Sequence, residues 1–103
     1  MIAPNDLDSS SERQPRFPLG ELVATPGAIE ALEGASQEPG KLLERHQSGD
    51  WGEVCAEDAA LNEAAIEDGI RIMSVYQLSR GMKVWVITEA GRSSTTILLP
   101  DEH

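Results

Sequence analysis

The sequence is poor in cysteine, in aromatic residues and in long apolar runs, and each scarcity excludes a class of protein. Cys55 is the single cysteine of 103 residues, which excludes an internal disulfide framework and a cysteine-rich zinc site. It favours a reducing, cytoplasmic location. Aromatic residues make up 4% of the chain, so the core must be mostly aliphatic. No run approaches the ~20 apolar residues of a membrane span, and the N-terminus lacks the features of a signal peptide, so we expect neither.

Basic residues are also scarce. The chain has 8 Lys and Arg against 18 Asp and Glu, for a net charge of -10. Since each phosphate contact needs a cation, this balance argues against general binding to nucleic acid or to an anionic membrane. Residues 50–69 hold seven acids and no base, whereas residues 70–103 hold three acids and four bases. The acidity is therefore a property of one segment, which could be an interaction surface.

The pattern predicts a flexible tail at residues 1–16 and one α+β domain at residues 17–103. We expect two or three short N-terminal helices packed on a three-stranded antiparallel β-meander. Residues 17–24 form an irregular apolar anchor or a short helical turn in this prediction. The helices are expected at residues 25–34, 36–49 and 56–68, with Thr25 and Ser36 as N-caps, and the strands at residues 70–78, 83–88 and 94–99.

The same pattern predicts which side chains are buried. Trp51 is expected to anchor the core, and Trp85 to lie on the sheet face opposite Val84 and Val86. If that face is bare, Trp85 belongs to an apolar patch with Met73, Val75 and Ile87. The core residues that we expect are Ile72, Leu78, Val84, Val86, Ile97 and Leu99 from the strands, and Leu32, Leu42 and Leu61 from the helices.

Several stretches together resemble one protein family. They are residues 19–28, His46, residues 48–52, Asp58, residues 62–63, residues 84–90 and residues 92–100. The family comprises small uncharacterised bacterial proteins of plasmids, prophages and other mobile elements, often labelled "plasmid-related protein" or type I restriction system subunit. The family pattern has aspartate where this chain has Gly91 and tyrosine where it has His103. A DNA methyltransferase needs a longer chain and a glycine-rich motif, and both are missing. The resemblance therefore implies a setting in mobile-element biology, but it does not indicate which activity the protein has.

Two groups of residues are candidates for catalysis. His46 with Asp50 has the composition of a general acid–base pair, although a structural role, as a helix-terminal cation and a turn aspartate, is the more common explanation. Arg92 with Ser93 and Thr95 could hold a phosphate, since a guanidinium and hydroxyls both donate hydrogen bonds to phosphate oxygens. The alternative is a plain hairpin turn followed by a strand rich in threonine.

The third group is acidic. It consists of Glu57, Asp58, Glu63, Glu67 and Asp68 on the expected third helix. These residues are either an ordinary solvated face or a row of charges that occupies a basic groove on another protein. We expect no metal site and no cofactor, because the glycine-punctuated spacing of a calcium loop is missing.

From these features we expect a small acidic accessory or regulatory protein that acts by protein–protein interaction, in mobile-element or defence biology. The partner is an unidentified protein, and a homodimer through the exposed edge of the sheet is a further possibility. The alternative is a small nuclease or toxin of barnase-like or RelE-like layout, with Arg92, Ser93 and Thr95 at a phosphate site and His46 as base.

Overall fold

The structure of the protein is a computed structural model, and it describes residues 15–102 with the exception of the Arg80 side chain. Of the tail predicted at residues 1–16, only Pro15 and Arg16 are among the described residues, and the rest of that prediction lies outside them. His103 lies outside them as well.

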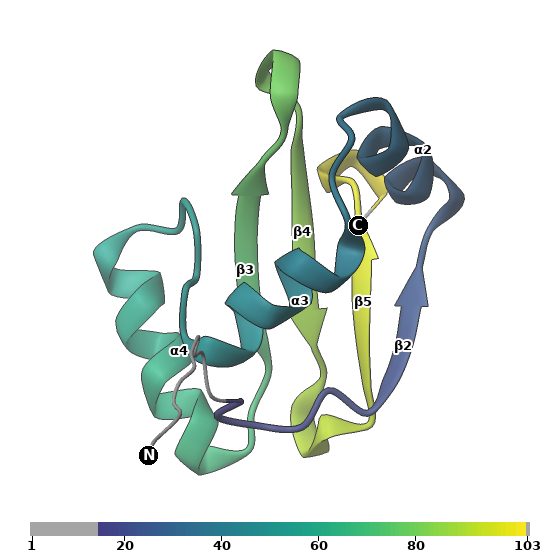
Figure 1. Ribbon diagram of the computed structural model, residues 1–103. Coiled ribbons are helices and arrows are strands. Elements are labelled where there is room, and N and C mark those ends of the chain that lie inside the picture. The colour runs from purple at the N-terminus through teal and green to yellow at the C-terminus, as the bar shows by residue number, and fades with distance from the viewer. Residues whose placement is uncertain (1–14, 103) are drawn as a thin grey trace, which may run out of the picture.

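Within the described residues, one short strand is followed by three α-helices and then by three consecutive strands (Figure 1). The helices are α2 (Pro26–Gly34), α3 (Pro39–Ser48) and α4 (Ala56–Asp68), and the strands are β2 (Glu21–Ala24), β3 (Ile72–Gln77), β4 (Lys83–Thr88) and β5 (Ser94–Leu98). Single turns of 3-10 helix follow the last three strands, at η1 (Ser79–Gly81), η2 (Ala90–Arg92) and η3 (Pro100–Glu102). The predicted α+β class is confirmed, with helices ahead of an antiparallel β3–β4–β5 meander.

The sheet has one strand more than predicted. Within residues 15–102 its order is β2-β5-β4-β3, and β2 pairs in parallel with β5, so this part of the chain forms a four-stranded, mixed sheet. The prediction of an irregular anchor or helical turn at residues 17–24 is therefore wrong for β2. A strand of four residues with three exposed positions has no clear alternation, and its partner lies at the far end of the sequence.

Local sequence signals explain where the helices begin and end. The Thr25 hydroxyl accepts a hydrogen bond from the Ala28 N–H (3.1 Å), and Pro26 occupies the first turn, so the predicted start of α2 is confirmed. The prediction for α3 is wrong in its cap, which is Glu38 rather than Ser36. Gly49 ends α3 in the left-handed region with φ 95°, a conformation that a glycine adopts without strain.

The core lies between the helices and one face of the sheet. Its larger cluster joins α2 and α3 to the sheet through Leu32, Leu42, Tyr76, Val84 and Val86, among others. A second cluster contains Phe17, Trp51, Ala65 and Ile72. The predicted anchor Trp51 is confirmed, and so are all the predicted core residues except two. Leu99 is half-buried.

The second exception is Leu61, whose predicted burial is wrong because its side chain is 63% exposed. Helix α4 instead turns Asn62 and Ala65 inward, with Ala59 and Ile66 packed beside them. The helix is rich in alanine, which fits a buried face and an exposed face equally well. The one leucine is therefore a poor guide to which face is buried.

The other face of the sheet carries two rows of side chains across three strands. The pairing register places Met73, Ile87 and Thr96 in one row, and Val75, Trp85 and Leu98 in the next. Neither core cluster includes a residue of this face. In the described part of the chain, no helix is long and apolar enough to cross a membrane.

Candidate functional site

The predicted base His46 lies at the centre of a buried chain of polar side chains between α3 and the sheet. Its imidazole has no exposed surface. Nδ1 lies 2.6 Å from the Ser74 Oγ, and Nε2 lies 2.9 Å from the Thr88 Oγ1. The Thr88 Oγ1 in turn lies 2.7 Å from the Thr95 Oγ1, since these two residues face each other across β4 and β5.

The far end of this chain fixes the direction of every hydrogen bond in it. The Thr95 hydroxyl donates to the Leu19 carbonyl oxygen (2.7 Å), so its oxygen can only accept from Thr88. Thr88 has then used its proton and must accept from the Nε2–H of His46. Nδ1 is left as an acceptor for the Ser74 hydroxyl. A neutral imidazole protonated at Nε2 therefore satisfies all four side chains at once.

The surroundings of His46 favour this neutral form. The ring packs edge-on against Phe17 and Trp51, with centroids 5.3 Å and 6.0 Å away. Burial, and then the positive charge of Arg92, lower the pKa of His46 to about 4. The imidazole is thus a neutral core residue that links α3 to two strands, and solvent does not reach it.

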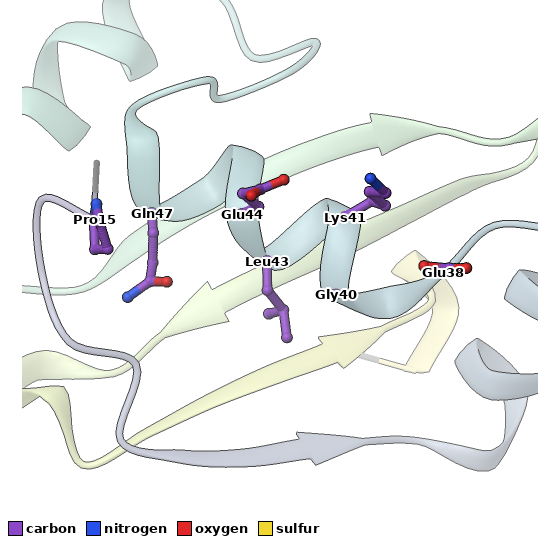
Figure 2. Close-up of a pocket in the computed structure, with 7 residues that line it drawn as sticks. All are labelled: Pro15, Glu38, Gly40, Lys41, Leu43, Glu44 and Gln47. Carbon is purple, nitrogen blue, oxygen red and sulfur yellow. The ribbon is translucent and has the colours of Figure 1, made fainter. Parts of the chain in front are cut away.

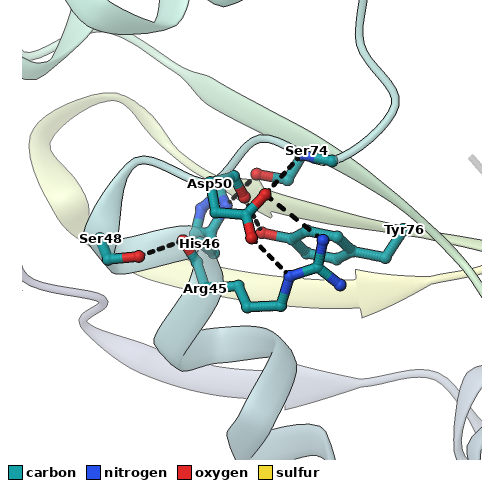
Figure 3. A network of polar contacts seen from close by, with 7 residues as sticks. Arg45, His46, Ser48, Asp50, Ser74 and Tyr76 are labelled. Atoms are coloured by element: carbon teal, nitrogen blue, oxygen red, sulfur yellow. Dashed lines mark hydrogen bonds and ion pairs between the residues drawn. The ribbon is translucent and has the colours of Figure 1, made fainter. Parts of the chain in front are cut away.

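The predicted pairing of His46 with Asp50 is wrong. Asp50 instead binds the neighbouring arginine, whose Nε donates to Asp50 Oδ2 at 2.7 Å (Figure 3). The Arg45 guanidinium also stacks 4.4 Å above the Tyr76 ring, and the Tyr76 hydroxyl donates to the Asp50 carbonyl oxygen (2.6 Å). The hydrogen bond from Arg45 to Asp50 raises the pKa of the arginine. Together these contacts fix the turn that follows α3.

Arg92 is held by backbone carbonyls rather than displayed as a phosphate-binding group. Its terminal nitrogens donate to the carbonyl oxygens of Ile70 (2.6 Å) and Ala65 (2.7 Å), and more weakly to that of Glu89 (3.4 Å). The guanidinium carbon lies 5.5 Å from the centre of the Phe17 ring. Helix α4 has no basic residue in its last turn. Arg92, which lies in the turn before β5, places its positive charge at the C-terminus of α4, where the helix dipole favours a cation.

The three residues of the predicted phosphate site do not converge. Thr95 is fully buried on the helix-covered face of the sheet, within the His46 chain. Ser93 is exposed, and its carbonyl oxygen accepts a hydrogen bond from the Glu21 N–H (3.1 Å). Arg92 is directed at the end of α4. The structure thus connects His46 with Thr95, and it leaves Ser93 apart from both.

The acidic residues of α4 fall into two groups. Glu63 has a structural role, because it receives two hydrogen bonds from Arg16 (2.7 Å and 3.1 Å) and one from the Trp51 indole (3.2 Å). The hydrogen bonds from Arg16 and, secondarily, from Trp51 lower the pKa of Glu63. The other four acids, Glu57, Asp58, Glu67 and Asp68, are exposed. No cluster of three or more metal-ligating side chains occurs among residues 15–102.

The exposed Leu61 lies on the same helix as these acids and lines, together with Asp58, a groove between α4 and β3. The groove has a volume of about 220 Å³, and its lining combines the apolar side chains of Val54, Leu61 and Met73 with Asp58, Asn62 and Arg71. Ile70, just beyond α4, is 50% exposed. This side of the molecule therefore offers apolar contacts surrounded by charge, a composition typical of protein interfaces.

The sheet face that carries Trp85 exposes less apolar surface than the sequence alone would permit. Trp85, Met73 and Val75 are half-buried, and Ile87 is only 3% exposed. The large exposed apolar patch that we considered for this face is therefore not formed.

Sequence reasoning missed Ser74 and Thr88, the direct partners of His46. Each stands at a position whose alternation places it on the buried face, between apolar neighbours. A polar residue at such a position needs a partner, and this signal could have identified both.

Compared with protein-family models, with curated proteins and with solved structures, the chain has no match.

Proposed function

We propose that this protein is a small accessory protein that binds another protein through the exposed surface of α4. The carrying observation is the contrast between the two sets of candidates. His46 and Thr95 belong to one buried hydrogen-bonded chain and Arg92 binds backbone carbonyls, whereas α4 displays an exposed leucine and four exposed acids. A buried imidazole in a complete hydrogen-bonded chain stabilises a fold, while an exposed leucine among charges suits a contact surface.

The chemistry of the surface defines the kind of partner. We expect a protein with a basic groove and an apolar pocket for Leu61, because four carboxylates lie on the same helix. The proposal includes that this partner is a protein of mobile-element or defence biology. The nuclease alternative gains no support from the site, since Ser93 and Thr95 face different environments.

The first experiment reverses charge at the C-terminal end of α4. The double variant Glu67→Lys/Asp68→Lys should retain its fold, because each cation near a helix C-terminus stabilises the helix by ~0.3–1 kcal/mol. We expect it to lose the partner that the wild type captures from host cells. Glu63 is left unchanged, since its reversal would break the contacts with Arg16 and Trp51.

The control variant is Glu30→Lys/Glu33→Lys, which changes the net charge equally at two exposed positions of α2. It should capture the same partner as the wild type. A third variant, Leu61→Ala, should weaken capture without loss of stability because its side chain is 63% exposed. Equal capture by all variants would exclude α4 as the contact surface.

A further inference from the structure

The two outer edges of the sheet differ in how their backbone groups are satisfied. On β3, the side-chain amide of Asn62 donates to the Met73 carbonyl oxygen (2.8 Å), and its oxygen accepts from the Met73 N–H (3.2 Å). Two residues along, the Val75 N–H donates to the Trp51 carbonyl oxygen (3.1 Å), and the Val75 carbonyl accepts from Glu53 (2.7 Å). The edge of β3 is thus closed to another strand at both positions.

Within the described residues, the outer edge of β2 is open. The Glu21 N–H donates to Ser93 and the Thr25 N–H donates to Ile97, both on the β5 side. Because backbone groups alternate along a strand, the N–H and C=O groups of Leu22 and Ala24 point to the opposite side. Among residues 15–102, no strand pairs with β2 on that side. Such an edge is a template for one further strand.

Apolar side chains border this edge. Leu22 is 56% exposed and Val23 is 44% exposed, on opposite faces of β2. Between β2 and α3 lies an apolar recess of about 150 Å³, lined by Leu22, Ala24, Pro39 and Leu43 with others. Leu43 also lines a wider groove along α3 and points from the helix toward the β2 side, as Figure 2 shows. A strand added to β2 would place its side chains against this recess.

We propose that β2 pairs antiparallel with β2 of a second copy of this chain, about a two-fold axis at Val23. In this register Leu22 and Ala24 of the two copies form the hydrogen-bonded pairs, and Val23 faces Val23 as a non-hydrogen-bonded pair. The two four-stranded sheets become one continuous sheet. The pairing covers the apolar residues that one copy leaves exposed at this edge.

The distribution of charge favours a second copy as the occupant. The one charged residue of β2 is Glu21, and the register places it opposite Thr25 of the second copy rather than opposite another acid. The acid-rich helix α4 packs against β3, at the other end of the strand order. Two chains of net charge -10 therefore join with their most acidic segments far apart. The pairing is independent of the function proposed for α4.

Sedimentation of purified full-length protein over a range of concentrations tests this pairing. We expect the wild type to reach twice its monomer mass as concentration rises. Val23→Lys and Val23→Glu should each remain monomeric, because like charges then meet at the axis. An equimolar mixture of the two variants should regain the dimer, because opposite charges meet there. Folding of each variant is checked by circular dichroism.

The matched control is Ile29→Lys on α2, which changes an apolar side chain with the same 44% exposure. It should dimerise like the wild type. A wild type that stays monomeric at every concentration would overturn the proposal and leave the β2 edge to a strand of a different protein. A dimer that persists with unchanged affinity in Val23→Lys would overturn it too, since its contact would lie elsewhere.

Discussion

At the scale of single residues, the polar side chains most suggestive of chemistry are those that connect separate parts of the fold. His46 links α3 to β3 and β4, and Arg92 links the end of α4 to the turn before β5. Both satisfy buried or terminal backbone and hydroxyl groups that would otherwise lack partners. A chain of 103 residues with few aromatics buries less apolar surface than a larger domain. Such polar links therefore contribute a larger share of its tertiary structure than they would in a larger protein.

The depressed pKa of His46 predicts how stability depends on pH. Above pH 6.5 the imidazole is neutral in both folded and unfolded chains, and between about 6.5 and 4 only the unfolded chain takes up a proton. The free energy of unfolding should therefore fall by about 3 kcal/mol as pH falls through this window. Urea unfolding at pH 7.5 and pH 4.5 measures the loss.

The variant His46→Gln isolates this contribution. Its stability should be lower than that of the wild type at pH 7.5, and its further loss between pH 7.5 and pH 4.5 should be much smaller. Glu63 and Glu102 also have lowered pKa values, from hydrogen bonds with Arg16 and Thr25 respectively, but their contributions are lost only at more acidic pH. The same pH slope in both proteins would show that His46 is not the titrating group.

Arg92 gives a second prediction at this scale. Arg92→Ala removes two short hydrogen bonds to backbone carbonyls and the positive charge at the end of α4, so we expect a loss of about 2 kcal/mol in unfolding free energy. Arg92→Lys should lose less, since it keeps the charge without the planar fork. Chemical denaturation of both variants checks the order, and equal stability of Arg92→Ala and wild type would contradict the assigned role.

At the scale of elements, the sequence predicts what is locally encoded. Helix α2 carries its own cap and first-turn proline, and β4 is a run of β-branched and aromatic residues, so both were predicted with correct or nearly correct bounds. Strand β2 was missed because its partner β5 is distant in the sequence. The partners of His46 were missed for the same reason, since Ser74 and Thr88 lie 28 and 42 residues away.

Asn62 provides the prediction for this scale, because one side chain closes the β3 edge. Asn62→Ala leaves the N–H and C=O of Met73 without their amide partner, and we expect a loss of about 1–3 kcal/mol. The opened edge should also promote association at high concentration. Thermal unfolding and light scattering measure both effects. Asp58→Ala, one turn away and exposed, is the control: it should not promote association, and it should lose only the ~0.3–1 kcal/mol that an acid in the first turn of a helix contributes.

At the scale of the whole molecule, positive and negative charges are distributed unevenly between the interior contacts and the exposed surface. The basic residues Arg45 and Arg92 are engaged within the fold, while most of the acids of α4 are exposed at one end of the sheet. The open edge of β2 lies at the other end of the strand order. A dimer formed there would present two acidic helices, and the apparent affinity for a partner with two basic sites would rise.

The most direct test compares the partner affinity and the stability of two folded variants, Glu67→Lys/Asp68→Lys and Arg92→Lys. The account predicts at least a tenfold loss of affinity for the first, with a stability equal to or above that of the wild type. For the second it predicts reduced stability with affinity within twofold of the wild type. The reverse pattern, in which Arg92→Lys abolishes binding while the α4 variant binds normally, would contradict the claim that function resides on the surface of α4.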